Sequence, residues 1–138
     1  MRTLVSGAMS APARICLIDD DVFVRDALAL GLTDAGFKVL TAPGAAAGYD
    51  LTARENIDAL VTDLNMPGTN GAQLIAQVRA RWPELPIVAI SGATVINGLS
   101  APDVARARGA DAVLIKPFRA RELAALLRRL LAARQTSS

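Results

Sequence analysis

Acidic, hydroxyl and ammonium side chains stand in this sequence where apolar, strand-like runs end. They are Asp19 and Asp20 after the first run, Asp63 after another, and then Ser91 and Lys116. In an open parallel α/β sheet, ligands bind outside the carboxyl ends of the strands, so these side chains would gather at one edge. Carboxylates placed together repel one another unless a cation lies among them. The sequence therefore predicts a site for a divalent metal ion and a phosphoryl group.

The acids suit Mg²⁺, although each of them has a structural explanation when taken alone. Asp19-Asp20-Asp21 would also fit the start of a helix, where the macrodipole favours negative charge. Asp63 would also fit an ordinary turn. Together the acids offer the carboxylate oxygens that Mg²⁺ takes while it keeps several waters, and a backbone carbonyl near Asn65 would add a ligand.

A hydroxyl and an ammonium complete the predicted site. Ser91 would hydrogen-bond a phosphoryl oxygen, and Gly92 beside it would leave space for that group. Lys116 would reach the same phosphoryl as a point charge. Taken alone, these residues also fit a turn at a strand end and an exposed lysine. The Lys116-Pro117 bond is a candidate for the cis form, which would fix the direction of the lysine, although most bonds before proline are trans.

Alternating elements must position these groups. Apolar runs predict strands over residues 15–18, 37–40, 59–61, 86–90 and 112–115. Helical stretches lie between these runs, which implies βαβ units with right-handed crossovers. We therefore expect a five-stranded parallel sheet with helices on both faces, in the α/β class.

The helices are predicted from apolar positions that repeat at spacings of three and four. The marker positions are Val24, Ala27, Leu28, Gly31 and Leu32 in the first helix, residues 45–54 as the second, Leu74, Ile75, Val78 and Trp82 in the third, residues 101–108 as the fourth, and Leu123, Leu127, Leu130 and Leu131 in the last. Ala35-Gly36 ends the first helix and Pro83 the third. Ser100 caps the fourth and Gly109 closes it.

Composition restricts the class of protein. A length of 138 residues fits one domain, and the hydrophobic share of 52% with 4% aromatic residues fits an aliphatic core. Cys16 is the single cysteine, so it forms no disulfide within the chain and is expected in the core. We expect a flexible segment over residues 1–12, a domain over 13–133 and a tail over 134–138.

Charge and hydropathy point to no nucleic acid or membrane partner. The net charge of +2 is too small to argue for nucleic acid, and the arginines near the end fit a solvated helix face, with an acidic partner surface as the alternative. No apolar stretch is long enough to span a membrane, and the first residues make a poor signal peptide. A cytoplasmic protein is therefore expected.

The motifs resemble, in this order, the receiver domain of bacterial response regulators. The resemblance covers about residues 13–133 and is carried by Asp19-Asp20, Thr62-Asp63, Asn65-Met66-Pro67, Gly71, Ser91-Gly92 and Lys116-Pro117-Phe118. It implies a flavodoxin-like, doubly wound (βα)5 fold with strand order 2-1-3-4-5. It also raises the expectation that the Lys116-Pro117 bond is cis.

The resemblance also implies a role for each residue of the site. Asp63 would accept a phosphoryl group from a phosphohistidine of a sensor histidine kinase or phosphotransfer protein, or from a small phosphodonor. Asp20 would bind Mg²⁺ directly and Asp19 through water, with the Asn65 carbonyl completing the site. Lys116 would offset charge on the phosphoryl group, and Ser91 would move toward it.

By this resemblance the chain is a signalling module and not a conventional enzyme. It would catalyse only its own phosphorylation and dephosphorylation, and would signal by binding a protein target that the sequence does not name. Because the chain has no histidine, it is neither the kinase nor a histidine phosphotransfer protein.

Two departures from the family pattern concern the output. Val113 stands where the family often has Tyr or Phe, so an aromatic side chain cannot report the movement of Ser91. Residues 92–99 make the segment before the fourth helix longer than is typical. We therefore hypothesise that ordering of this segment is the switch, which unchanged amide exchange on phosphorylation would refute.

Two other readings compete with the receiver. A haloacid-dehalogenase-like phosphatase would use Asp19 as nucleophile and Asp21 as acid/base, with residues 88–92 as its second motif. Against this reading, no acidic pair follows a strand after Lys116 in the sequence, and Asp63 would have no role. A receiver fold that serves as a constitutive interaction module is the second alternative, although such relatives tend to lose one of the site residues.

Overall fold

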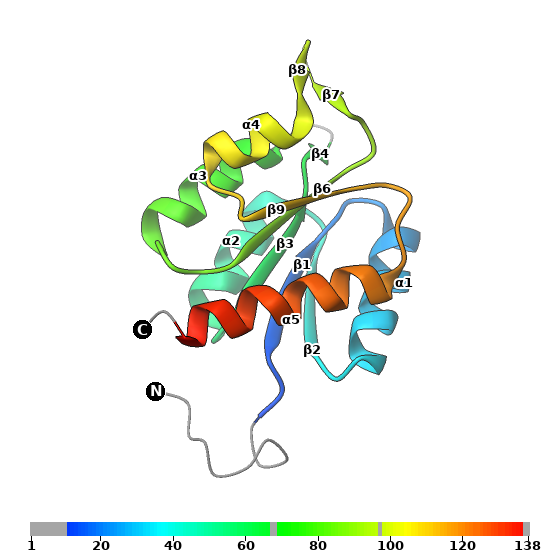
Figure 1. The fold of residues 1–138 in the computed structure, drawn as a ribbon, viewed down its shortest axis with the longest axis vertical. Helices are drawn as coiled ribbons and strands as arrows, with labels where there is room; N and C mark the ends of the chain where they lie inside the picture. The colour runs from blue at the N-terminus through cyan, green and yellow to red at the C-terminus, as the bar shows by residue number, and fades with distance from the viewer. Residues whose placement is uncertain (1–10, 67–68, 97, 137–138) are drawn as a thin grey trace.

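The computed structural model describes residues 11–66, 69–96 and 98–136 (Figure 1). A sheet of parallel strands lies at its centre. The strands are β1 (Arg14–Ile18), β2 (Lys38–Ala42), β3 (Ala59–Asp63), β6 (Ile87–Ser91) and β9 (Ala112–Ile115). They are arranged in the order β2-β1-β3-β6-β9, which confirms the predicted order 2-1-3-4-5 and the flavodoxin-like class. Every residue of β3 and β6 is buried, as expected for central strands of a sheet that is covered on both faces.

Helices cover the two faces of this sheet (Figure 1). They are α1 (Val22–Asp34), α2 (Ala45–Arg54), α3 (Gly71–Arg81), α4 (Ala101–Arg108) and α5 (Ala120–Thr136). Side chains of α1 and α5 pack with Ile15 and Leu17 on one face, while those of α3 and α4 pack with Cys16 and Ile18 on the other. Successive residues of β1 thus point to opposite faces, and a largely aliphatic core forms on each side.

The predicted boundaries agree closely with those observed. The second and fourth helices and the last strand have the predicted limits. The β3 strand continues past residue 61 to Asp63, so this carboxylate belongs to the strand and does not follow it. The α5 helix continues to Thr136, beyond the point where the tail was expected to begin. Of the expected flexible segment over 1–12, residues 1–10 lie outside the described residues.

The first helix buries a different set of residues from the predicted one. Leu28 and Leu32 are buried, but Ala27, which was expected on the apolar face, is exposed. Arg25, three residues before Leu28, is half-buried instead. An α-helix has 3.6 residues per turn, so positions 25, 28 and 32 lie on the same face of the helix. The helix therefore turns a charged residue toward the protein.

Two short antiparallel hairpins were not predicted. One pairs β4 (Asn65–Met66) with β5 (Thr69–Asn70), and the other pairs β7 (Val95–Ile96) with β8 (Leu99–Ser100). The second hairpin occupies most of the segment 92–99 that was expected to be a loop, and it leads directly into α4 (Figure 1). Val95 and Leu99 on it are exposed. Part of this segment is therefore paired as strands, and position 97 lies outside the described residues.

Helix caps agree with the sequence. Asp21 caps α1, because its Oδ1 accepts hydrogen bonds from the N–H groups of Phe23 (3.0 Å) and Val24 (3.3 Å). Ser100 caps α4, and Gly109 ends it with φ of 119°, a backbone conformation that favours glycine. Among the described helices, none has both the length and the apolar character needed to cross a membrane.

Carboxylates bind backbone N–H groups at the amino ends of two strands. Asp111 Oδ2 accepts a hydrogen bond from the N–H of Ile87 (2.8 Å), the first residue of β6, and lies 2.7 Å from Arg79 Nη2. Asp58 Oδ2 accepts a hydrogen bond from the N–H of Arg14 at the start of β1 (2.8 Å). Each of these carboxylates thus binds a backbone N–H at the start of a strand.

Candidate phosphoacceptor and metal site

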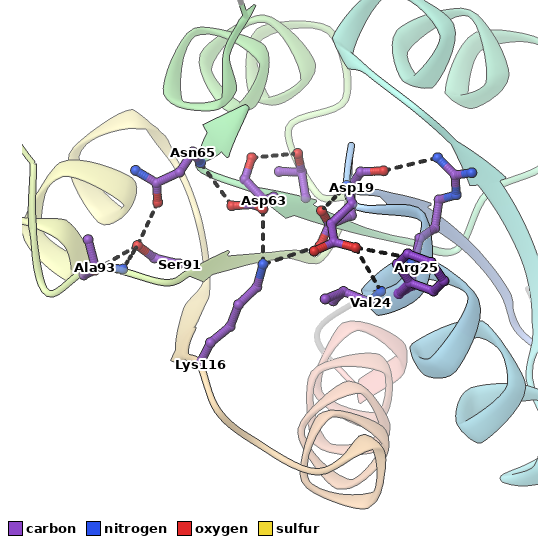
Figure 2. A network of polar contacts seen from close by, with 11 residues as sticks. Asp19, Val24, Arg25, Asp63, Asn65, Ser91, Ala93 and Lys116 are labelled. Carbon is purple, nitrogen blue, oxygen red and sulfur yellow. Dashed lines mark hydrogen bonds and ion pairs between the residues drawn. The ribbon is translucent and has the colours of Figure 1, made fainter. Parts of the chain in front are cut away.

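The opposite, carboxyl edge of the sheet brings the predicted site residues together (Figure 2). Asp19 follows β1, Asp63 is the last residue of β3, Ser91 is the last of β6, and Lys116 follows β9. These strands are parallel and are neighbours in the sheet, so their carboxyl ends lie side by side. Residues up to 97 positions apart in the sequence therefore come within hydrogen-bond distance.

Three carboxylates and one ammonium group lie together at this edge. Lys116 Nζ lies 3.1 Å from Asp63 Oδ2 and 3.4 Å from Asp19 Oδ2. Carboxylate oxygens of Asp19, Asp20 and Asp63 lie within 4.8 Å of one another. Asp19 and Asp63 are buried, whereas Asp20 is exposed. The negative charge exceeds the positive charge here, and the donor atoms are all hard oxygens, so the residues fit Mg²⁺.

Burial and neighbouring charges shift two pKa values at the site. Burial raises the pKa of Asp19 and the charge of Asp63 adds to this, although the Asp21 N–H and Lys116 oppose it. Burial alone would lower the pKa of Lys116, but its interactions with Asp63 and Asp19 outweigh this and raise it. Lys116 is therefore a cation at neutral pH. A further positive charge nearby would stabilise the ionised form of the Asp19 carboxylate.

The backbone fixes the direction of the Asp63 carboxylate. The N–H of Asn65 donates to its Oδ1 at 2.8 Å, while its Oδ2 faces Lys116. The start of α3 packs directly against this strand end, because a Cβ built on Gly71 would collide with the Asp63 carbonyl oxygen and lie 2.8 Å from Leu64 Cα. The absence of a side chain at position 71 thus allows the helix to begin here.

Ser91 is engaged with neighbours other than Asp63 (Figure 2). Its Oγ lies 2.9 Å from Asn65 Oδ1 and 2.6 Å from the carbonyl oxygen of Ala93, and it accepts a hydrogen bond from the N–H of Ala93 (3.1 Å). The residue is buried, while Gly92 beside it is exposed. Ser91 thus links the segment after β3 to the segment that leads into the β7–β8 hairpin.

The Lys116–Pro117 bond is cis, as expected. Val113 is half-buried and packs against the core on the α4 side of the sheet. Asp21 uses its carboxylate to cap α1. The phosphatase reading needs Asp21 as an acid/base, so this geometry does not favour it.

Two contacts at the site were not predicted from the sequence, one made by Arg25 and one by the side chain of Asn65. Arg25 Nη1 donates a hydrogen bond to the carbonyl oxygen of Asp19 at 3.1 Å (Figure 2). A charged residue three positions before a buried leucine on the same helix is a signal that would have pointed to Arg25. Nothing in the sequence indicates that the Asn65 amide would meet Ser91.

A doubly wound sheet with acids and a lysine at its carboxyl edge is what the resemblance to receiver domains, a class of signalling modules, implies. The family described as response regulator receiver domain matches residues 15–128. This chain therefore belongs to the response regulator receiver family, the receiver domains of two-component systems.

Individual relatives agree with this assignment. The response regulator protein FleR of Pseudomonas aeruginosa is 34% identical over 117 residues, which cover 85% of this chain and 24% of FleR. The response regulator MprA of Mycobacterium leprae is 36% identical over 122 residues, which cover 86% of this chain and 50% of MprA. The chain thus spans about a quarter to a half of the length of these curated relatives.

Solved structures show the same fold. A CheY-like receiver domain protein from Methanospirillum hungatei superimposes with a TM-score of 0.84 at 22% identity, over 92% of this chain and 99% of that one. A putative response regulator from Chloroflexus aurantiacus gives 0.79 at 30% identity, over 88% and 98% of the two chains.

Proposed function

We propose that this receiver accepts a phosphoryl group on Asp63 and thereby switches its binding to a protein target. The observation that carries the proposal is the buried Asp63 carboxylate, held 3.1 Å from Lys116 beside two further acids. A structural carboxylate would be neutralised by its partners, whereas this cluster keeps an excess of negative charge for a ligand to balance. The donor would be a sensor histidine kinase or a phosphotransfer protein.

The transfer exchanges one phosphorus bond for another. A carboxylate oxygen of Asp63 attacks phosphorus, an O–P bond forms, and the N–P bond of the donor phosphohistidine breaks with its electron pair returning to the imidazole. Later attack by water on phosphorus would release phosphate and restore the carboxylate. Lys116 would contact the transferring group, because its ammonium already lies beside Asp63.

The acids would hold Mg²⁺, with Asp20 and Asp63 as direct ligands, Asp19 acting through water, and the Asn65 carbonyl as a further ligand. The three acids are close enough for this, because their carboxylate oxygens lie within 4.8 Å of one another. The division between direct and water-mediated ligands is the one that the family resemblance implies. When bound, the ion supplies positive charge to the phosphoryl oxygens and to the carboxylates.

Ser91 would carry the signal away from the site. To reach a phosphoryl group on Asp63, its hydroxyl must leave Asn65 Oδ1 and the Ala93 carbonyl. Ala93 leads into the β7–β8 hairpin, and the Ala101 N–H at the start of α4 bonds to the Thr94 carbonyl (2.9 Å). Movement of Ser91 would therefore change the hairpin and the start of α4, which we propose as the output surface.

The partner that donates the phosphoryl group would cover the first turn of α1. Phe23 lies two residues from the Asp21 cap and is 84% exposed, and Val22 beside it is also exposed. An apolar ring so exposed next to a charged site is available to a docking protein. A Phe23→Ala variant would then lose phosphotransfer from its kinase and keep phosphorylation by a small donor.

Intact-mass spectrometry after incubation with Mg²⁺ and acetyl phosphate would test the proposal. We expect one added phosphoryl group on the natural protein, its loss in Asp63→Asn, and its retention in Asp111→Asn, a carboxylate at the opposite edge of the sheet. An adduct lost only in Asp19→Asn would favour the phosphatase reading. A natural protein that takes no phosphoryl group from either acetyl phosphate or its kinase would favour a constitutive interaction module.

A further inference from the structure

Asp19 marks the point where β1 leaves the sheet. Its N–H still donates to the Ala42 carbonyl of β2 (3.3 Å), but the regular pairing of β1 ends at Ile18. The Asp19 carbonyl is instead bound by Arg25 Nη1 at 3.1 Å, from the buried face of α1 (Figure 2). Arg25 thus takes the place of a strand neighbour at the end of β1.

This hydrogen bond also orients Asp20. The Asp19 carbonyl and the Asp20 Cα belong to one planar peptide unit, so a bond to the carbonyl fixes where Asp20 starts. On the other side, the Asp21 N–H donates to Asp19 Oδ1 at 2.9 Å. No hydrogen bond to the Asp20 carboxylate is present within the described residues. Its position therefore depends on the backbone that Arg25 and Asp21 hold.

The side chain of Arg25 is not placed as a solvated surface group. Its Nε is buried and has no hydrogen-bond partner, which is unfavourable for a charged side chain. Arg25 shows no ion pair with Asp19 or Asp20 in the described structure, and Asp19 is paired with Lys116. Its contact with the site is therefore a directed hydrogen bond to the backbone.

We propose that Arg25 is a positioning residue for the metal site, which acts by holding the Asp19–Asp20 peptide so that the Asp20 carboxylate faces Asp63. The inference rests on the proposed Mg²⁺ site and adds a residue that does not itself touch the ion. Residues that orient metal ligands in this way typically change metal affinity by about 10- to 100-fold when removed.

Titration calorimetry with Mg²⁺ alone tests the proposal on the full chain. We expect Arg25→Met to weaken Mg²⁺ binding by about tenfold, since it keeps the apolar stem and removes the donor. Arg25→Gln, which keeps a neutral N–H donor, should recover part of the loss. Arg128→Met is the matched control, because Arg128 Nη2 also donates to a backbone carbonyl, that of Ala35, at 2.7 Å. It should bind Mg²⁺ as the natural protein does.

Amide NMR spectra supply a second measurement that a general loss of stability would not reproduce. Without Mg²⁺, the Asp20 and Asp21 signals should shift in Arg25→Met and stay in place in Arg128→Met. At saturating Mg²⁺, Arg25→Met should take up a phosphoryl group at the rate of the natural protein. If Arg25→Met does not fold, Arg25→Gln and Arg25→Lys provide the same comparison.

Two results would overturn the role of Arg25 and leave the proposed function intact. One is a natural protein that binds Mg²⁺ and accepts a phosphoryl group while Arg25→Met binds Mg²⁺ equally well. The other is full recovery in Arg25→Lys with none in Arg25→Gln, which would show that charge and not a directed hydrogen bond is responsible. A natural protein that does not bind Mg²⁺ would overturn the metal site and this inference together.

Discussion

The two edges of the central sheet use the same types of side chain in opposite ways. At the amino edge, Asp111 binds the N–H of Ile87 and the guanidinium of Arg79. At the carboxyl edge, Lys116 contacts Asp19 and Asp63, and the Asp20 carboxylate lies beside these two acids. At the amino edge, the carboxylate is bound by hydrogen-bond donors and a cation of the chain itself. At the carboxyl edge, the negative charge of the carboxylates exceeds the positive charge that the chain supplies. This excess of negative charge distinguishes a ligand site from a structural ion pair.

Removal of Lys116 should give the largest difference between the edges. We expect Lys116→Ala to lower the rate of phosphoryl uptake by about 100-fold or more, because the positive charge nearest Asp63 is lost. Arg79→Ala, the equivalent change at the amino edge, should leave the rate unchanged. A time course of intact mass with acetyl phosphate measures both. Similar rates in Lys116→Ala and the natural protein would show that the carboxyl edge does not differ functionally from the amino edge in this respect.

Mg²⁺ should stabilise the fold through the carboxyl edge only. At a concentration about 100 times its dissociation constant, a ligand that binds only the folded state adds about 2.7 kcal/mol to the free energy of unfolding. Urea unfolding with and without Mg²⁺ should show this gain in the natural protein and in Asp111→Ala. Asp20→Asn should lose most of it. An equal gain in Asp20→Asn would place the metal elsewhere.

Loss of a carboxylate should destabilise the protein at the amino edge but not at the carboxyl edge. We expect Asp111→Ala to lower the free energy of unfolding by about 1–2 kcal/mol, because the Ile87 N–H loses its acceptor. The ion pair itself adds little, since the Asp111 side chain is 41% exposed. Asp63→Asn without Mg²⁺ should keep or raise stability, because repulsion among the acids falls. Urea unfolding in parallel decides between these outcomes.

Cys16, in β1 between the two edges, should give the smallest effect. Burial raises the pKa of its thiol from an ordinary 9.0 to about 11, with a hydrogen bond from Thr52 in opposition. Between these values the unfolded chain has released a proton that the folded chain keeps, so stability falls as pH rises from 9 toward 11. The fall should be shallower in Cys16→Ala. Iodoacetamide should label Cys16 only in urea, and rapid labelling of the folded protein would contradict its burial.

Sequence reasoning succeeded where one signal determined the outcome. Apolar runs gave the five strands, and the rule that ligands bind at carboxyl ends brought Asp19, Asp63 and Lys116 together. The ion pair between Arg79 and Asp111 was missed, because it joins residues 32 positions apart and depends on how α3 lies against α4 and the turn that follows it. No local pattern marks such a contact.

The hairpin before α4 was missed for a different reason. Val95-Ile96 and Leu99 flank an Asn-Gly pair, which is the strongest short sequence signal for a hairpin turn. The prediction of a single loop over residues 92–99 did not take this Asn-Gly signal into account. Because the segment is already paired over β7 and β8, a switch based on ordering it would have to begin from a formed hairpin. The roles of the site residues remain predictions that the proposed experiments test.

The contact between Gly71 and the phosphoacceptor strand also bears on how this sequence can diverge. Since a Cβ at position 71 would collide with the Asp63 carbonyl, even alanine there would push α3 away from the strand end or move the Asp63 carboxylate relative to Lys116. In a saturation library scored separately for abundance and for phosphoryl uptake, position 71 should tolerate no replacement by either score. We thus expect position 71 to remain glycine during evolution, although this residue takes no part in the chemistry itself.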